Sequence, residues 1–218
     1  MIGRRRPVVR INRPITSVEG PCRAPRLRVG LLGGSFNPAH QGHLAISLEA
    51  LKRLKLNRVW WLVSPQNPLK PMDETADLEK RLAGARALAR HPRLVVSDLE
   101  RKIGTRYTVE TLRWLTRRRD RFVWLIGADN LVQLPQWQRW RRLVRMAPIA
   151  VFDREPYSYV ALAGRMARAY AGKRLVERRA PVLADSPPPA WVYLRLRRHQ
   201  VSSTAIRQKQ AASRRRSR

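Results

Sequence analysis

Short apolar runs alternate along the chain with stretches in which apolar residues recur at helical spacing. The helical pattern is clearest where Leu78, Leu82 and Ala85 follow one another three or four residues apart. Several of the short runs are apolar at consecutive positions, which is typical of strands buried on both faces of a sheet. The pattern predicts strands at 27–32, 59–63, 94–96, 122–126, 149–152 and 192–196, and helices at 44–54, 77–89 and 109–115.

This alternation predicts an α/β fold built on a doubly wound, mostly parallel sheet. In such sheets, ligands bind outside the carboxyl ends of the strands, near the point where the strand order reverses. A chain of 218 residues is long enough to bury one substantial core. We therefore expect a single domain whose candidate site is formed by residues that directly follow predicted strands.

The two ends of the chain lack this periodicity. Residues 1–26 mix arginines with four prolines, and residues 209–218 include a run of arginines. Mutual repulsion and helix breakers predict flexible basic extensions on either side of a folded domain at 27–208. Cys22, in the first extension, is the one cysteine of the chain. A single cysteine forms neither an intrachain disulfide nor a multi-cysteine metal site.

The charge balance adds a tendency to attract polyanions. The chain has 46 Lys and Arg against 15 Asp and Glu, a formal net charge of +31. A hydrophobic content of 44% with seven Trp nevertheless excludes a wholly disordered chain. No apolar run approaches the roughly 18 residues that span a bilayer, and the arginine-rich start lacks the apolar stretch of a secretory signal. We expect a cytoplasmic protein without membrane contact, whose basic ends bind polyanions non-specifically.

The most informative stretch follows the first predicted strand and reads GGSFNPAHQGH over residues 33–43. Its two leading glycines are expected to let the backbone turn tightly and approach a ligand closely. Backbone N–H groups, a helix N-terminus and the imidazoles of His40 and His43 would then converge on one anion. The alternatives are a purely structural turn and metal binding by the histidines, although no nearby Cys or carboxylate completes a zinc set.

A second constellation, SSTAIR at 202–207, follows the last predicted strand and starts a C-terminal helix. Its hydroxyl groups can donate to a phosphate, and Arg207, one turn later, offers a guanidinium that binds phosphate through two hydrogen bonds. Ser-Ser-Thr is also a common helix cap. The functional interpretation of this segment therefore depends on the glycine–histidine turn.

Together, GGSFNPAHQGH at 33–43, GADN at 127–130 and SSTAIR at 202–207 resemble the nucleotidyltransferase superfamily and, within it, the bacterial nicotinate mononucleotide adenylyltransferases. The resemblance covers about residues 27–208, in the same motif order. Relatives that transfer adenylate to phosphopantetheine usually carry Thr at the first histidine, so His40 favours the pyridine-nucleotide branch. The resemblance implies a Rossmann-like fold and the transfer of adenylate from ATP to nicotinate mononucleotide, giving nicotinate adenine dinucleotide and pyrophosphate in NAD biosynthesis.

The same resemblance implies roles for individual residues. His43, supported by His40, would be catalytic and would stabilise charge at the α-phosphate. Mg²⁺ would bridge phosphate oxygens of ATP, bound largely by the nucleotide and water, with no dedicated protein metal site. The ATP phosphates would contact Gly34, Ser35, Phe36, Ser203, Thr204 and Arg207. The mononucleotide or its ribose would contact Gly33, Thr108, Asp129, Trp137 and Lys70.

Four of these assignments have structural alternatives. Asp129 and Thr108 are also suited to cap the helices that follow them. Trp137 suits core or surface packing, and Lys70 suits a solvated surface position. Many family members carry a histidine directly before this lysine, where the chain has Leu69, so a histidine contact there is not transferred.

The competing interpretation is a nucleic-acid-binding protein. The net charge would give salt-sensitive attraction to phosphate backbones, but the chain contains no recognised nucleic-acid module. Much of the charge is also spread through the predicted domain, as at 117–119 and 141–142, which is typical of solvated faces. Within the adenylyltransferase interpretation, nicotinamide mononucleotide is an alternative acceptor, and the sequence indicates no oligomeric state.

Overall fold

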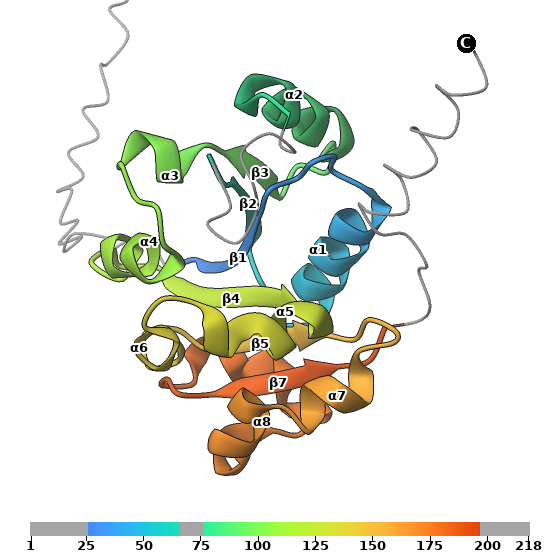
Figure 1. Cartoon of the computed structure of the whole chain (residues 1–218), viewed down its shortest axis with the longest axis vertical. Helices are drawn as coiled ribbons and strands as arrows, with labels where there is room; N and C mark the ends of the chain where they lie inside the picture. The colour runs from blue at the N-terminus through green and yellow to red at the C-terminus, as the bar shows by residue number, and fades with distance from the viewer. Residues whose placement is uncertain (1–25, 66–75, 197–218) are drawn as a thin grey trace, which may run out of the picture.

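The computed structural model describes residues 26–65 and 76–196. At its centre, seven strands form one sheet in the order β3-β2-β1-β4-β5-β7-β6 (Figure 1), and every neighbouring pair is parallel. The predicted α/β fold is confirmed, and the sheet is wholly rather than mostly parallel. The strands are β1 (Arg28–Gly34), β2 (Arg58–Val63), β3 (Leu94–Ser97), β4 (Arg121–Gly127), β5 (Ile149–Phe152), β6 (Arg174–Leu175) and β7 (Trp191–Leu194).

Helices connect the strands and cover both faces of the sheet. The α-helices are α1 (Gln41–Arg53), α2 (Leu78–Leu88), α3 (Leu99–Lys102), α4 (Thr108–Leu115), α5 (Ala128–Gln133), α6 (Trp140–Val144), α7 (Ser158–Leu162) and α8 (Arg165–Ala169). The 3-10 helices are η1 (Leu134–Gln136), η2 (Ala171–Lys173) and η3 (Glu177–Asp185). No helix within the described residues is long and apolar enough to cross a membrane.

Alternate side chains of the central strands enter two separate apolar layers. In β4, for example, Trp124 lies in one layer, whereas Val123 and Leu125 lie in the other. Residues of α4, α5, α6 and α8 close the first layer, and residues of α1, α2 and η3 close the second. Burial on both faces explains why the strands read as consecutive apolar runs.

Several boundaries differ from the prediction. β1 continues to Gly34, two residues beyond its predicted end, and α1 begins at Gln41 instead of Leu44. The last predicted strand, 192–196, is observed at Trp191–Leu194. The pattern missed β6, which has two residues, and α3 and α5–α8, which have four to six residues each. Such elements are too short to show a period.

The strand order reverses at β1. β2 and β3 lie on one side of it, and β4 and the later strands lie on the other. Because β1 and β4 are parallel and paired, with Leu32 opposite Leu125, the loops after both strands meet at the same edge of the sheet. This edge carries the segments 33–43 and 127–130, at the position where open α/β sheets bind ligands.

Candidate active site

β1 ends in two glycines, Gly33 and Gly34. The Trp124 ring leaves no room for a side chain at the first of them. A Cβ atom on Gly33 would lie 2.8 Å from Cη2 and 2.9 Å from Cζ2 of Trp124, whereas one on Gly34 would meet no atom closer than 3.6 Å. Both glycines lie inside β1, and neither has a positive φ. The expectation that this pair forms the tight turn is therefore wrong: Gly33 makes room for an indole ring of β4.

Phe36 forms the strained part of the turn. Its φ of 47° lies in the left-handed region, which is unfavourable for a bulky side chain. The ring is 1% exposed, stacks on Trp61 of β2 with centroids 5.2 Å apart, and lies 4.5 Å from the ring of His43. Packing against two other elements thus holds the turn in a conformation of a kind that clusters at ligand-binding sites.

His40 and His43 begin helix α1 and are hydrogen-bonded to its backbone. His40 is the N-cap residue, and its Nδ1 accepts from the N–H of Gly42 at 3.1 Å. The N–H of His40 donates to Nδ1 of His43 at 3.2 Å, and the ring centroids are 3.9 Å apart. Because both Nδ1 atoms accept a hydrogen bond, each neutral ring carries its proton on Nε2.

Burial keeps both imidazoles neutral. Desolvation, followed by the charges of His40 and Arg154, lowers the pKa of His43 from 6.5 to about 3. Desolvation, followed by the charge of Arg154, lowers the pKa of His40 to about 4. At neutral pH the pair therefore supplies two uncharged Nε2–H donors at the start of a helix.

Ser47 fixes the first turn of α1 against the sheet. Its hydroxyl donates to the carbonyl of His43 at 2.7 Å and accepts from Nε1 of Trp61 at the same distance. Ser47 and Trp61 are both fully buried. The backbone of His43 is thereby tied to β2 as well as to its own helix.

Asp129 lies in the first turn of α5, directly after β4. This helix begins at Ala128 with Gly127 as its N-cap, so the alternative that Asp129 caps a helix is wrong. Oδ2 of Asp129 pairs with Arg154 at 2.8 Å. Oδ1 is buried without a hydrogen-bond partner among the described residues, in space that Gly127 leaves open. Leaving a buried acceptor unpaired is costly, so this atom is a candidate for accepting from a ligand.

Arg154 is a candidate site residue that the sequence pattern did not reveal. It follows β5, pairs with Asp129, and its charge lowers the pKa of both histidines. The preceding Asp153 anchors this segment, because it accepts from the Tyr193 hydroxyl at 2.6 Å and bonds the Ser158 hydroxyl. The available signal was an arginine close after a buried strand, but 46 Lys and Arg in the chain made it inconspicuous.

Thr108 and Trp137 are not joined to the histidines by any hydrogen bond or ring contact among the described residues. Thr108 is the first residue of α4 and Tyr107 is its N-cap, so the alternative that Thr108 caps this helix is wrong. Trp137 is half-buried and packs against the apolar layer of α4 and α6, in agreement with the packing alternative.

The remaining predicted residues lie outside the described residues: Lys70, Ser203, Thr204 and Arg207, together with Cys22. The structure thus brings together the segment 33–43, Asp129 and Arg154. Within the described ranges, no group of three or more His, Cys, Asp and Glu side chains could hold a metal ion.

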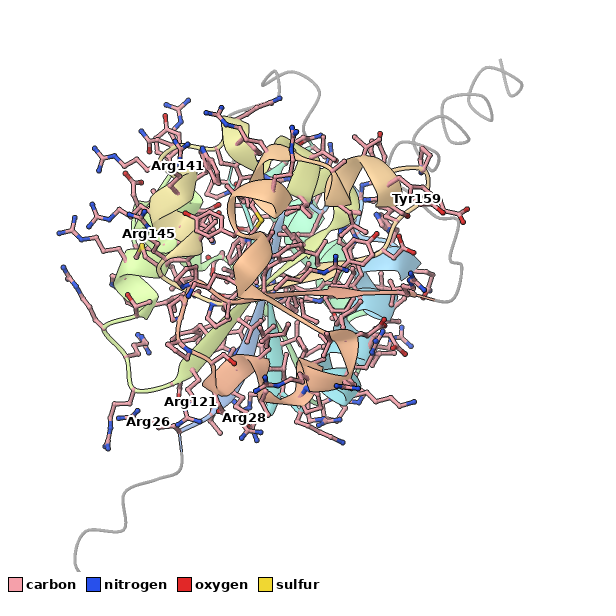
Figure 2. The ribbon with its side chains drawn as sticks, turned by 90° about the horizontal axis from the view of Figure 1, so that it is seen from below. Arg26, Arg28, Arg121, Arg141, Arg145 and Tyr159 are labelled. Atoms are coloured by element: carbon pink, nitrogen blue, oxygen red, sulfur yellow. The ribbon has the colours of Figure 1, made fainter. Side chains whose placement is uncertain are left out.

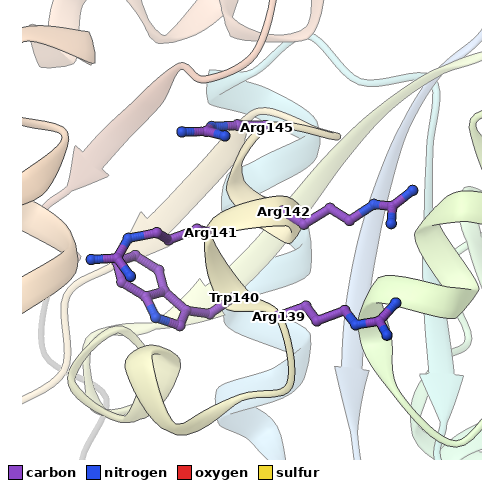
Figure 3. A pocket seen from close by; sticks show the side chains of 5 residues that line it. All are labelled: Arg139, Trp140, Arg141, Arg142 and Arg145. Atoms are coloured by element: carbon purple, nitrogen blue, oxygen red, sulfur yellow. The ribbon is translucent and has the colours of Figure 1, made fainter.

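In the part of the chain that the structure describes, positive charge away from the histidine turn forms no second ligand pocket. Trp140 and four arginines line a hollow of about 440 Å³ on α6, and Arg139 and Arg142 point to the opposite side from Arg141 and Arg145 (Figure 3). Figure 2 shows Arg141 and Arg145 extending outward, and none of the four has an ion pair among the described residues. Diverging guanidinium groups give diffuse attraction rather than a pocket for one ligand.

Comparison with known proteins identifies relatives of the whole described domain. The cytidylyltransferase-like family model matches residues 31–209. A protein of Methylorubrum extorquens, named probable nicotinate-nucleotide adenylyltransferase, is 51% identical over 183 residues, which cover 83% of this chain and 99% of the relative. A protein of the same name from a Bradyrhizobium species is 54% identical over 183 residues, which cover 83% and 95%.

A solved structure shares the fold. Plasmodium falciparum nicotinic acid mononucleotide adenylyltransferase, complexed with NaAD, matches with a TM-score of 0.63 at 13% sequence identity. The match covers 84% of this chain and 83% of that one. At 13% identity this structure shows the fold alone, whereas the sequence relatives at 51% and 54% identity show the family. The chain belongs to the cytidylyltransferase-like family and, within it, to the nicotinate-nucleotide adenylyltransferases.

Proposed function

We propose that the chain transfers adenylate from ATP to nicotinate mononucleotide, forming nicotinate adenine dinucleotide and pyrophosphate in NAD biosynthesis. One observation carries this proposal: two neutral histidines, anchored through Nδ1, start the helix that follows the central strand at the reversal of strand order. The family of the chain supports the same reaction.

The chemistry requires positioning more than activation. The 5′-phosphate of the mononucleotide is an anion at neutral pH, so no side chain needs to generate the nucleophile. One of its oxygens forms a bond to the α-phosphorus of ATP, and the bond from that phosphorus to the bridging oxygen breaks, so pyrophosphate leaves with the electron pair. The protein must hold two anions in line and stabilise the charge that shifts between them.

His43, with His40 beside it, is the proposed catalytic donor. An Nε2–H donor stabilises developing charge on the α-phosphate oxygens without taking or giving a proton. Because Nδ1 of each ring is bonded to the backbone, the rings are held in place before substrate binds. Preorganised donors stabilise a transition state without a reorganisation cost during the reaction.

The remaining contacts divide between the two substrates. Gly34, Ser35 and Phe36 would line the ATP phosphates, together with Ser203, Thr204 and Arg207. Gly33, Thr108, Trp137 and Lys70 would contact the mononucleotide. Asp129 would accept from a ribose hydroxyl, which would satisfy its unpaired Oδ1, and Arg154 would hold Asp129 while supplying positive charge beside the phosphates.

Mg²⁺ would enter with ATP as part of the substrate. Phosphate oxygens and water suit its octahedral geometry, and this arrangement needs no dense cluster of protein carboxylates. Asp129 already pairs with Arg154, whose charge also acts on both histidines. This carboxylate is therefore already engaged by a cation.

Pyrophosphate release by the purified protein tests the proposal. MgATP is supplied with nicotinate mononucleotide, nicotinamide mononucleotide or phosphopantetheine in parallel assays. We expect turnover with the nicotinate form to exceed turnover with the other two. Preference for another acceptor would support adenylyl transfer but reject the assigned substrate. Absence of pyrophosphate release with all three acceptors would reject adenylyl transfer.

We further propose a cytoplasmic location and non-specific contact between polyanions and the basic ends, with the domain at 27–208 carrying the activity. Deleting residues 1–25 and 212–218 should spare nucleotide transfer and remove most binding to a heparin column. Salt-sensitive binding that survives the deletion would assign the attraction to the arginines of the domain, including those on α6.

A further inference from the structure

Arg81 of helix α2 is a buried arginine whose hydrogen-bond acceptors, within 26–65 and 76–196, are all backbone carbonyls. The residue is 4% exposed. Its Nε donates to the carbonyl of Ala76 at 2.8 Å, and Nη2 donates to that of Pro65 at 2.9 Å. Its Nη1 donates to the carbonyls of Ser35 and Ser64, both at 2.7 Å. Four of the five N–H groups of the guanidinium are therefore used.

These carbonyls come from three separate segments of the chain. Ser35 belongs to the turn after β1, Ser64 and Pro65 follow β2, and Ala76 directly precedes the start of α2. A second bond joins the first two segments, because the N–H of Ser64 donates to the carbonyl of Gly34 at 3.0 Å. Arg81 thus fastens the histidine-bearing turn to the neighbouring strand and helix.

No ion pair among the described residues explains the burial of this cation, although the charge of Asp77 at the start of the helix favours it. Arg81 forms no salt bridge among the described residues. Removing a charge from water is costly, and an apolar side chain of similar volume fills a core position at lower cost. What the guanidinium adds is a rigid, planar set of donors that reaches several carbonyls at once, which a lysine ammonium cannot reproduce.

We propose that Arg81 is a positioning residue for adenylyl transfer, which fixes the carbonyl of Ser35 and thereby the strained Phe36 turn relative to the end of β2. This inference rests on the proposed function. The ring of Phe36 packs against that of His43 at 4.5 Å, so a displaced turn changes the support of the catalytic histidine. Small displacements of reacting groups lower turnover strongly, since alignment contributes much of the catalysis.

The test compares Arg81→Lys, Arg81→Gln and Arg81→Met with the same changes at Arg86, an exposed arginine on the same helix. For each variant, kcat and the KM of both substrates, the unfolding temperature and amide hydrogen exchange over residues 34–43 are measured. We expect Arg81→Lys to retain the fold, lower kcat on the order of 100-fold and speed exchange in the turn. The Arg86 variants should remain within about twofold of the unmodified protein, as expected for a surface site.

Wild-type kcat and KM in folded Arg81→Lys would overturn the proposal, and so would a loss confined to the unfolding temperature. Failure of all three Arg81 variants to fold, where the Arg86 variants fold, would assign Arg81 a purely structural role and also contradict it. If the unmodified protein forms no product from the two substrates, the proposed function is rejected instead. In that case the exchange comparison would still decide whether Arg81 holds the turn.

Discussion

The backbone N–H of His40 donates to Nδ1 of His43 at 3.2 Å, and this bond links helix capping to the orientation of the proposed catalytic donor. The same contact that satisfies an N–H group at the start of α1 fixes the tautomer of His43. His40 is held in the same way by the N–H of Gly42. A helix start that folds correctly therefore fixes the tautomer of both rings and leaves both Nε2–H groups as donors.

Both histidines should titrate far below the ordinary range of histidine. In ¹⁵N-histidine-labelled protein, with signals assigned through His40→Asn and His43→Asn, we expect Nε2-protonated rings at pH 7 and apparent pKa values near 4 and 3. Because the unfolded chain binds these protons near pH 6.5, the free energy of unfolding should fall as pH falls from 6.5 towards 4. A midpoint near 6.5 for either ring would contradict this assignment.

Arg154 should support both Asp129 and the neutral histidines. In Arg154→Met, Asp129 loses its ion pair, and we expect kcat/KM to fall roughly 10–100-fold, as expected for a lost charge-assisted hydrogen bond. Removing the positive charge should also raise the pKa of His40 and His43 in the NMR titration. The exposed Arg165 provides the control substitution, and equal effects at both arginines would argue against a role for Arg154.

Gly33 should tolerate a methyl group far less well than Gly34. In Gly33→Ala, the added Cβ would overlap the ring of Trp124, and we expect the free energy of unfolding to fall by about 1–3 kcal/mol, the usual cost of overpacking. In Gly34→Ala, the nearest atom lies 3.6 Å away. Chemical denaturation of both variants and of Gly33→Ala with Trp124→Phe measures the difference. Equal losses at the two glycines, or no recovery with the smaller ring, would count against the steric explanation.

Glu100 should destabilise the folded protein when it ionises. The residue is 7% exposed, Thr111 donates to it at 3.3 Å, and desolvation, opposed by Thr111 and Ser64, raises its pKa to about 7. The unfolded carboxyl ionises near pH 4.5, so this group's contribution to stability is lost as pH rises from 4.5 to 7.

Glu100→Gln should therefore raise the free energy of unfolding at pH 8 by about 1–3 kcal/mol and by much less at pH 4.5. Urea denaturation at several pH values measures the change, with Glu49→Gln as the control because Glu49, a partly buried carboxylate on α1, forms no salt bridge with any described residue. A gain that does not depend on pH would contradict the assignment.

Strands with continuous apolar runs were predictable from the sequence. Six of the seven strands were anticipated for this reason. The end of β1 was not, since glycine carries no hydrophobic signal and the constraint on Gly33 comes from Trp124, which is distant in sequence and adjacent only in the folded sheet. Local pattern cannot report such a contact.

In the candidate site, too, some residues were predictable from the sequence and others were not. His40 and His43 were identified because they share one short motif. Arg154 and Arg81 were missed, since an arginine among 46 basic residues becomes informative only when its partners are known. For Arg154 the partner is a carboxylate on another loop, and for Arg81 the partners are carbonyls of three segments.

The most direct measurement compares adenylyl transfer by the unmodified protein and by His43→Ala, with MgATP and nicotinate mononucleotide at saturation. We predict that the unmodified protein forms nicotinate adenine dinucleotide and that His43→Ala, with an unchanged circular dichroism spectrum, loses more than about 100-fold in kcat, the cost of one preorganised donor. A folded His43→Ala enzyme with near-normal kcat would contradict the central claim.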